Sequence, residues 1–387
     1  MLFGPAEAVN TREIESLGLL AIKIAQMYAA RPDILEAETC QKLANLYENA
    51  TPLPFSELKN LIPPQTLKSF AELDENPLAT ASLGQVHLAQ LHSGEKVIIK
   101  IVRPTQTQNF EKDVAALSTL LKPSVFFYPK LKRLADPIGT LETIRRTTTH
   151  EIELLHEISG TKKLTELRDQ GQSTHPHLKN LSFAKIHENL SNNDVLVVDF
   201  LEAPSVRTQL KNGTFPYPAL LELFRIHGYF LFLHGKFHGD LHPGNIHYQD
   251  GKFWFIDNAN IEEAPVKFTR GLLRFLTALG EENLDDAARA MLDLAESPHP
   301  NPELFKVKFH ELYHGFLGKT VSEASLTTQM MNTVKLAVHT GLDFPQGAFP
   351  VIKSLMYLDG MALQCGPDEY LLKDVLAFVR DLPSSEH

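Results

Sequence analysis

The pattern of apolar and polar positions along the chain predicts a mixture of helices and short strands. Residues 96–102 are expected to form a buried strand, because their apolar run is interrupted in its middle only by Lys100. An apolar run that does not alternate is typical of a strand with both faces covered. Shorter runs near 184–186 and at 195–198 predict further strands. Residues 1–75 are expected to be mostly helical, with prolines marking the breaks between helices.

A second pattern, later in the chain, predicts a β-hairpin. Residues 245–248 are an apolar-rich strand, residues 249–252 contain the Asp-Gly turn signal, and residues 253–256 are the returning strand. The hairpin therefore delivers Asp257 at its end, directly after a strand.

The loop that leads into this hairpin carries the most informative motif. Residues 238–245 read HGDLHPGN, and Asp257 follows twelve residues after Asn245. This spacing matches a kinase-type catalytic loop, in which Asp240 receives the acceptor proton while Asn245 and Asp257 hold a metal. Phosphoryl transfer needs Mg²⁺ and hence converging hard oxygen ligands. The pattern predicts a phosphotransfer site.

Two other interpretations of this segment stay open from the loop alone. Asp240 and Asn245 also suit an ordinary loop in which they form turns. A transition-metal site would use histidines instead, although Pro243 and Gly244 break any helix that would align them. The histidines recur every four or five residues, at His234, His238, His242 and His247.

Upstream segments supply the partners that a kinase site needs. A lysine such as Lys100 is costly to bury unless it is paired, and in kinases it contacts the α/β-phosphates and a helical glutamate. Residues 149–158 have helical apolar spacing, with Glu153 and Glu157 one turn apart on one face. A small-residue loop at 76–87 runs into the strand before Lys100. The alternatives are a water-facing lysine on an edge strand and a solvated acidic helix face.

Several further motifs make a family recognisable. Residues 17–26 (LGLLAIKIAQ) are followed by RPDIL at 31–35, residues 79–87 read ATASLGQVH, and residues 151–153 read EIE. In this order they resemble the KxGQ signature, the RPD(L/I)L stretch that follows it, the alanine-rich loop and the ExD motif of the UbiB-type atypical kinases, which include the ADCK proteins. Residues 353–362 resemble the helix that closes that domain. The resemblance covers most of residues 16–370.

The chain departs from the family pattern at several positions. Ala25 stands where the signature has glycine, Thr80 replaces one alanine of the loop, and Glu153 replaces the aspartate of ExD. Asp257 is followed by Asn258 and Ala259, where a kinase has Phe-Gly. A degenerate, slow or purely nucleotide-binding protein therefore stays an alternative.

The resemblance implies an α+β, two-lobed protein-kinase-like fold with an additional N-terminal helical segment and helical insertions. Residues 1–75 would be the N-terminal helical extension with the KxGQ-like motif. Residues 76–202 would be the N-lobe with a helical insertion and the hinge, and residues 203–387 the helical C-lobe with the catalytic loop.

The resemblance also implies ATP or ADP with Mg²⁺ as cofactors and assigns the site. Lys100 would hold the α/β-phosphates and Glu157 would orient it, while Asp240 would position the acceptor oxygen or water. Asn245 and Asp257 would carry the metal. The remaining nucleotide-binding positions lie in the loop, the hinge and the N-terminal helix, with the motif acids nearby: Ala79, Thr80, Ala81, Ser82, Asp199, Leu201, Lys23, Gln26, Glu151 and Glu153.

In the family the N-terminal motifs cover the place where a protein substrate would lie. This implies ATP hydrolysis or small-molecule chemistry rather than protein phosphorylation, in support of ubiquinone or other isoprenoid-quinone lipid metabolism, with a lipid or quinone-biosynthesis proteins as partners. An aminoglycoside-phosphotransferase-like small-molecule kinase shares the HGDLHPGN loop and is one alternative. A non-catalytic nucleotide-binding pseudokinase within a biosynthetic complex is the other.

Composition narrows the picture without selecting a function. The 387 residues carry a formal net charge of −10, which argues against a nucleic-acid partner. Cys40 and Cys365 form no disulfide framework and suit a reducing cytosol. The most apolar stretch, 220–237, is too charged to span a bilayer, and no signal peptide is visible. We expect a cytoplasmic protein without an integral membrane anchor, and peripheral contact at the inner face of a membrane stays open.

Overall fold

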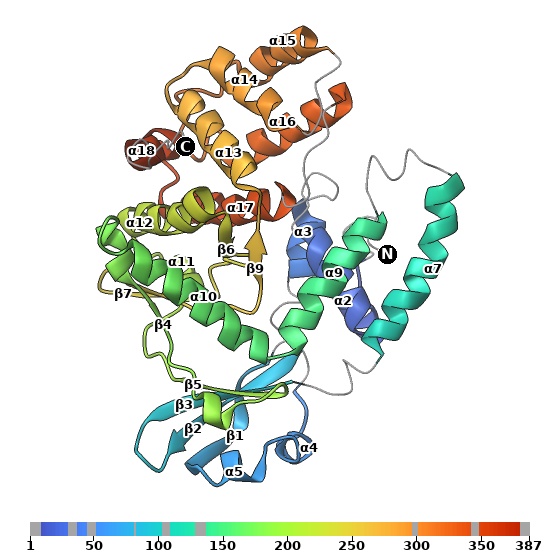
Figure 1. Cartoon of the computed structure of the whole chain (residues 1–387), viewed down its shortest axis with the longest axis vertical. Coiled ribbons are helices and arrows are strands. Elements are labelled where there is room, and N and C mark those ends of the chain that lie inside the picture. Colours follow the sequence, from blue (N-terminus) through green and yellow to red (C-terminus); the bar gives the residue numbers. More distant parts are fainter. Residues whose placement is uncertain are drawn as a thin grey trace. The chain divides into compact units, whose positions relative to one another are not determined.

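The computed structural model describes residues 9–29, 37–44, 52–80, 83–102, 109–127, 137–295, 301–341 and 348–379. The chain forms two compact units, which Figure 1 shows coloured along the sequence. Unit 1 comprises Met1–Gly160 and Ala184–Phe200, and unit 2 comprises Thr161–Phe183 and Leu201–His387. The three-part functional division expected from the sequence stays a prediction.

Unit 1 is built on a four-stranded antiparallel sheet. Along β3, Val97, Ile99 and Ile101 are fully buried in a core that also contains Phe55 of α4. Lys100 lies on the opposite face of the same strand. Ile98 and Lys100 on that face are only half-buried, so the apolar run overstated how completely both faces of β3 are covered. The strands, in sheet order, are β1 (Phe70–Thr80), β2 (Gly84–Leu91), β3 (Lys96–Val102) and β5 (Val195–Asp199).

The expected loop beginning at residue 76 is wrong, because strand β1 continues to Thr80 and pairs with β2. The mostly helical segment expected for residues 1–75 likewise ends earlier, because β1 begins at Phe70. Pro77 obscured this strand in the sequence. It is tolerated because β1 is an edge strand whose register is irregular on both sides of Pro77.

The helix expected across residues 149–158 is also interrupted. Helix α9 ends at Ile152 and α10 begins at Leu155, so Glu153 lies in the turn between two helices. The amide of Leu154 donates to the carbonyl of Asn193 at 3.0 Å, which diverts the backbone from the helical hydrogen-bonding pattern. Glu153 and Glu157 therefore do not share one face of a single helix, and that prediction was wrong.

The helices of unit 1 form a second apolar group. Leu19 and Leu20 of α2 pack with Phe110 of α7 and with Leu141 of α9. The RPDIL segment at 31–35 lies outside the described residues. The described helices are α1 (Thr11–Ser16), α2 (Leu19–Ala29), α3 (Ala37–Ala44), α4 (Phe55–Lys59), α5 (Pro64–Leu67), α7 (Phe110–Phe127), α9 (Pro137–Ile152), η4 (Glu188–Leu190) and α10 (Leu155–Gly171), which continues into unit 2.

Unit 2 contains the predicted hairpin. Asp250 and Gly251 have φ of 50° and 81°, the left-handed pair that a tight two-residue hairpin turn requires. The hairpin prediction is confirmed. Its strands are β7 (Ile246–Gln249) and β8 (Lys252–Phe255), β4 (Leu181–Phe183) pairs parallel with β8, and β6 (Lys236–His238) pairs with β9 (Ile261–Glu263).

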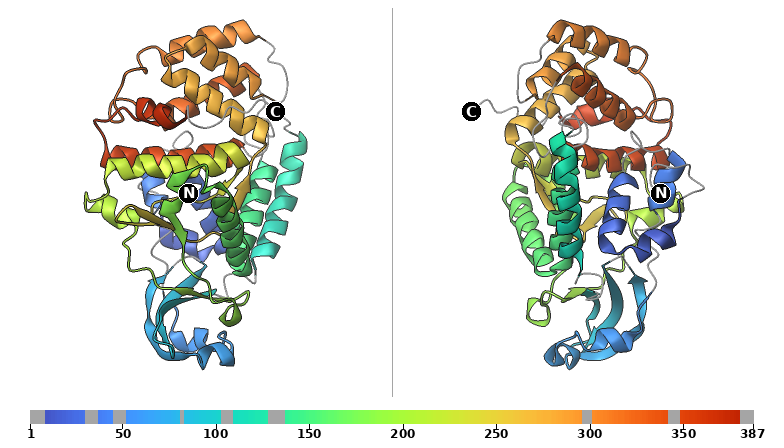
Figure 2. Two further views of the ribbon diagram at one scale, coloured as in Figure 1. Left: turned by 60° about the vertical axis from the view of Figure 1, so that its left-hand side comes forward. Right: turned by 90° about the vertical axis from the view of Figure 1, so that its right-hand side faces the viewer.

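Helices surround these strands with one large apolar core. Figure 2 shows α12 and α17 side by side within unit 2, where they are in contact. No helix among the described residues is both long enough and apolar enough to cross a membrane. The helices are η3 (Pro176–Asn180), α11 (Val206–Lys211), α12 (Tyr217–Gly228), the π-helical turn η5 (Tyr229–Leu233), α13 (Val266–Gly280), α14 (Leu284–Asp293), α15 (Pro302–Tyr313), α16 (Leu326–Thr340), α17 (Ala348–Cys365) and α18 (Leu371–Val379).

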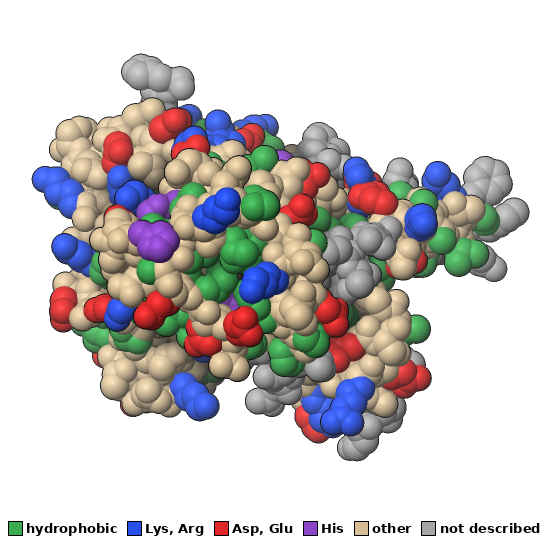
Figure 3. All heavy atoms as spheres, turned by 90° about the horizontal axis from the view of Figure 1, so that it is seen from below, with side chains coloured by type: hydrophobic (Ala, Val, Ile, Leu, Met, Phe, Trp, Pro, Cys, Tyr) green, Lys and Arg blue, Asp and Glu red, His purple; other side chains and the backbone are tan. Residues whose placement is uncertain are grey.

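The surface seen in Figure 3 mixes charges of both signs. Among the described residues on this face, lysine and arginine side chains lie interspersed with aspartate and glutamate. The net negative charge of the chain is therefore not gathered into one acidic patch on this face.

Stability should fall in acid because His227 is buried in the core of unit 2. Its Nε2 lies 3.0 Å from Oγ of Ser354, and burial lowers its pKa to about 3. Below pH 6.5 the unfolded chain binds a proton at this residue that the folded chain does not, so stability falls between pH 6.5 and 3. The slope is at most about 1.4 kcal/mol per pH unit. Denaturant unfolding at several pH values should show a shallower slope for His227→Gln.

The matched control for this prediction is His314→Gln, which changes an exposed histidine. That variant should keep the slope of the wild type. Equal slopes for wild type and His227→Gln would show that His227 does not drive the acid destabilisation.

Candidate functional site

Strands β6 and β9 position the start of the HGDLHPGN loop, residues 238–245. His238 is the last residue of β6, and the amide of Gly239 donates to the carbonyl of Asn260 at 2.8 Å. A Cβ atom at Gly239 would lie 2.5 Å from Cγ of Glu262. A glycine is therefore needed where the chain leaves the strand.

His238 is a structural part of this loop. It is almost completely buried, and its Nδ1 accepts from the amide of Asp240 at 3.1 Å. Its Nε2 then carries the proton and donates to the carbonyl of Ile256 at 3.0 Å. Burial lowers the pKa of His238, which favours this neutral form.

The backbone of Ile256 links the segments that carry the two expected metal ligands. Its carbonyl accepts from His238, and its amide donates to the carbonyl of Asn245 at 3.0 Å. Asp257, the next residue, has a φ of 59°, which aspartate tolerates better than most residues. Its backbone conformation is unusual, as is common at functional sites.

Asn245 and Asp257 fit a magnesium ion. The Asn245 side-chain nitrogen donates to the carbonyl of Asp240 at 3.0 Å, which directs its amide oxygen away from that bond and makes it the atom that would hold a metal. An amide oxygen and a carboxylate are hard oxygen donors of the kind that Mg²⁺ prefers.

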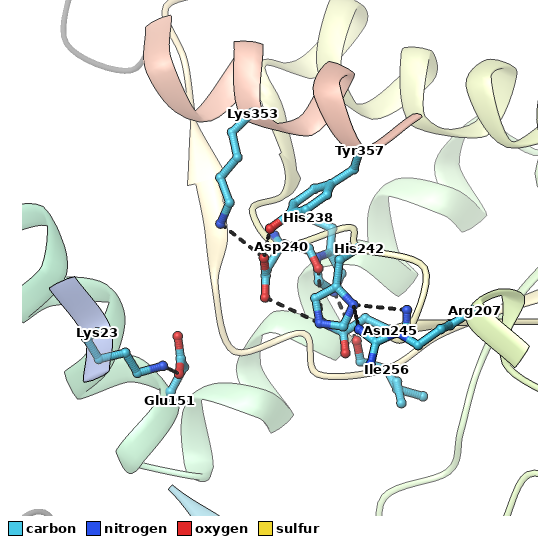
Figure 4. Close-up of polar contacts among 11 residues, drawn as sticks. Lys23, Glu151, Arg207, His238, Asp240, His242, Asn245, Ile256, Lys353 and Tyr357 are labelled. Carbon is cyan, nitrogen blue, oxygen red and sulfur yellow. Dashed lines mark hydrogen bonds and ion pairs between the residues drawn. The ribbon is translucent and has the colours of Figure 1, made fainter. Parts of the chain in front are cut away.

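Asp240 is held by two residues of α17, as Figure 4 shows. Its Oδ1 accepts from Nζ of Lys353 and from the hydroxyl of Tyr357, each at 3.0 Å. Burial alone would raise the pKa of Asp240, but the Lys353 ammonium and neighbouring groups lower it well below its ordinary value. Asp240 is therefore a carboxylate at neutral pH.

The His242 side chain contacts the loop backbone near Gly244 and the Arg207 side chain. Its Nδ1 accepts from the amide of Gly244 at 2.9 Å and from the Arg207 guanidinium at 3.4 Å. A Cβ atom at Gly244 would lie 2.7 Å from Cε1 of His242, so the close approach needs glycine. The Nε2 of His242 lies 3.9 Å from Oδ2 of Asp240.

The histidines of this region do not converge on one point. His238 and His242 have the loop contacts given above, the Nδ1 of His247 lies 2.6 Å from the carbonyl oxygen of Ala203, and the His234 ring packs on Tyr229. In the part of the chain that the structure describes, no group of three or more His, Cys, Asp or Glu is arranged to hold a metal. The transition-metal interpretation therefore finds no support in these residues.

In unit 1, the start of α10 packs on the sheet face that carries Lys100. Leu154 and Ile158 pack with Val102, which lies on the same face of β3 as Lys100. Glu157 stands between these two apolar residues in sequence and is 5% exposed. The structure thus places the two expected partners in one region of unit 1, and their roles stay predictions.

The N-terminal motifs meet within unit 1. Lys23 of α2 forms an ion pair with Glu151 of α9, which Figure 4 also shows. Gln26 is buried, and Ala25 is fully buried, so the small residue expected at this position is required by packing. Glu153 instead pairs with His156 at 3.1 Å.

The remaining expected nucleotide contacts are only partly described. Ala79 and Thr80 lie at the end of β1, whereas Ala81 and Ser82 lie outside the described residues. Asp199 ends β5, where its carboxylate contacts Nε2 of His187 at 2.8 Å and its amide donates to the carbonyl of Lys185 at 2.9 Å. Leu201 follows at the start of unit 2's second segment. Their roles as nucleotide contacts stay predictions.

Three further residues of this site were not expected from the sequence: Arg207, Lys353 and Tyr357. A signal was present for the last two, because a lysine and a tyrosine four residues apart interrupt the apolar helix α17 on one face. Their target, Asp240, could not be inferred from that spacing.

Comparison with known proteins gives the family. A model of the ABC1 atypical kinase-like domain matches residues 45–291, which is more than half of the chain. The chain belongs to this family. The ABC1 family match confirms the expected UbiB-type resemblance and the α+β, kinase-like fold class.

Individual proteins similar to this chain are consistent with its membership of the ABC1 family. It is 27% identical to the uncharacterized protein slr0889 of Synechocystis, over 92% of this chain and 90% of that protein. It is also 27% identical to the probable protein kinase UbiB of Histophilus somni, over 92% of this chain and 67% of that protein. The structure of Rv3197 from Mycobacterium tuberculosis, solved with erythromycin, shares its fold at 18% identity, with a TM-score of 0.52 and 92% and 94% of the two chains covered.

Proposed function

We propose that this chain is a UbiB-type atypical kinase or ATPase that binds Mg²⁺-nucleotide and transfers or hydrolyses the terminal phosphoryl group. The observation that supports this most is the arrangement around Ile256, whose two backbone groups tie His238 and Asn245 to the segment carrying Asp257. A catalytic aspartate and two oxygen ligands are thereby held by one short network.

Each residue has a defined task in this proposal. Asn245 and Asp257 hold the metal, which when bound neutralises charge on the phosphate oxygens. Asp240, kept as a carboxylate, orients the attacking hydroxyl or water. In unit 1, Lys100 contacts the α/β-phosphates and Glu157 orients Lys100.

The biological role is proposed by family resemblance. UbiB-type proteins support ubiquinone or other isoprenoid-quinone lipid metabolism, and we assign this chain the same kind of role, with a lipid or quinone-biosynthesis protein as partner. By the same resemblance, the N-terminal motifs, which the Lys23–Glu151 pair joins, favour ATP hydrolysis or small-molecule phosphorylation over protein phosphorylation.

One observation favours a second candidate, a nucleotide-binding pseudokinase. The side-chain nitrogen of Asn258 donates to the Thr161 hydroxyl at 3.1 Å and to the carbonyl of Phe255 at 3.3 Å, while Ala259 is buried. The segment after Asp257 is thus anchored where kinases keep a flexible Phe-Gly pair. Measured ATP turnover, with and without lipid, separates the two candidates.

The proposal predicts that Asp257→Asn weakens Mg²⁺-nucleotide binding, because a neutral amide replaces a charged oxygen ligand. The expected loss is on the order of 10- to 100-fold, as is usual for changes in and around a metal's ligand shell. Thermal-shift titrations with MgATP, MgADP and ATP in excess chelator measure it.

Asp250→Asn is the matched control, since Asp250 is exposed at the turn of the same hairpin. This variant should bind MgATP like the wild type. If Asp257→Asn is stabilised by MgATP as strongly as the control, Asp257 is not a metal ligand.

A further inference from the structure

Two donors from one helix converge on a single oxygen of the catalytic aspartate. Lys353 and Tyr357 are four residues apart on α17, so their side chains lie on the same helix face. Both reach Oδ1 of Asp240 at 3.0 Å, and the Lys353 ammonium also lies 5.5 Å from the centre of the Tyr357 ring. Figure 4 shows both side chains extending from α17 toward Asp240.

The helix that supplies these donors is fixed in the core of unit 2. Val351 and Leu358 of α17 are fully buried. Ser354, between the two donors, is also fully buried and lies within hydrogen-bonding distance of His227 on α12. The donors are thus presented by a rigid element, which is how precise positioning of a catalytic group is achieved.

The two oxygens of Asp240 consequently have different surroundings. Oδ1 accepts two hydrogen bonds, one of them from a cation, which uses its lone pairs. Oδ2 faces Nε2 of His242 at 3.9 Å, a distance longer than a hydrogen bond. Oδ2 is therefore the oxygen that can accept a hydrogen bond from a hydroxyl or water outside the loop.

We propose that Lys353 and Tyr357 are positioning residues of the phosphoryl-transfer reaction, which hold Asp240 by Oδ1 so that Oδ2 orients the attacking hydroxyl or water. This inference rests on the proposed function. Both residues lie beyond residues 45–291, the part of the chain that the ABC1 family model matches. The catalytic loop of the matched domain thus depends on a helix outside the match.

Lys353 and Tyr357 serve a single phosphoryl-transfer step. The attacking oxygen forms a bond to the terminal phosphorus, and the bond from that phosphorus to the bridging oxygen breaks. The electron pair of the broken bond stays on the nucleoside diphosphate. The proton of the attacking oxygen passes by way of Oδ2 of Asp240 to water, while Oδ1 remains bonded to α17.

Steady-state ATP hydrolysis and MgATP binding of five variants test the inference. Lys353→Met should lower kcat by on the order of 10²-fold, the usual effect of removing one preorganised electrostatic group, with KM and MgATP affinity little changed. Lys353→Arg should restore much of kcat, because it keeps a cationic donor. Tyr357→Phe should lower kcat by roughly 10-fold, the lower end of what one hydrogen bond to a charged group contributes.

In the double variant Lys353→Met/Tyr357→Phe, the fold-decrease in kcat should be smaller than the product of the two single fold-decreases. The reason is that both donors act through the same oxygen. Lys373→Met is the matched control, because Lys373 is an exposed lysine on α18. It should behave like the wild type. Variants of Lys353 and Tyr357 that bind MgATP and keep the wild-type kcat would overturn the inference.

A crystal structure of the double variant gives a readout that does not depend on turnover. The Asp240 carboxylate should leave the orientation that it has in the wild type. An unchanged orientation would overturn the positioning role, whatever the activity. By contrast, a wild-type protein that neither binds MgATP nor hydrolyses it would contradict the proposed function, so the two failures can be told apart.

Discussion

Replacing Asp240 with asparagine is expected to lower ATP turnover by about 10²- to 10⁴-fold, the range in which a positioned acid or base contributes. Asparagine has nearly the same shape as aspartate but lacks its negative charge. In the wild type that charge is stabilised by the hydrogen bonds that Lys353 and Tyr357 donate to Oδ1. Its amide nitrogen donates where a carboxylate oxygen accepted, so the attacking hydroxyl or water loses its partner. Steady-state hydrolysis of MgATP measures the effect.

Nucleotide binding should survive this change, because the proposed metal ligands, Asn245 and Asp257, are unchanged. Calorimetric titration with MgATP should give Asp240→Asn an affinity close to that of the wild type and of the Asp250→Asn control. Turnover equal to that of the wild type would remove Asp240 from the reaction. MgATP binding without turnover in the wild type itself would instead support the pseudokinase candidate.

The second large effect is expected from Phe255→Ala. Phe255 is 1% exposed, and its ring contacts Phe183 and His238 edge-on. Truncating a buried phenylalanine to alanine costs about 3–5 kcal/mol. For a unit of this size that lowers the thermal unfolding midpoint by roughly 6–20 °C. Calorimetric or circular-dichroism melting measures the shift.

The same variant should also weaken Mg²⁺-nucleotide binding, because Phe255 anchors the strand that ends two residues before Asp257. Val307→Ala is the control, since Val307 is 58% exposed on α15 and its truncation should change stability by less than about 0.5 kcal/mol. If Phe255→Ala unfolds at the same temperature as Val307→Ala, the hairpin does not contribute to the stability of the core.

The local parts of the site could be predicted from the sequence. The hairpin followed from an Asp-Gly turn between two apolar strands, because the left-handed backbone at Asp250 and Gly251 is a property of that dipeptide. Family membership followed from several motifs in a fixed order, and the model match confirms it.

The parts that depend on distant contacts could not be predicted. The helical spacing of apolar residues continues through Glu153, and only the bond from Leu154 to the carbonyl of Asn193 shows that the helix stops there. Strand β1 likewise depends on its pairing with β2 around Pro77. The contact of Lys353 with Asp240 joins residues 113 apart, and no local pattern encodes it.

The attachment of Asp240 to α17 has a consequence for the order of events during protein synthesis. Tyr357 is made 117 residues after Asp240, which at usual translation rates is a delay on the order of ten seconds. During that interval the nascent chain already contains the whole HGDLHPGN loop and its hairpin. Asp240 can acquire both donors from α17 only after the ribosome has released that helix.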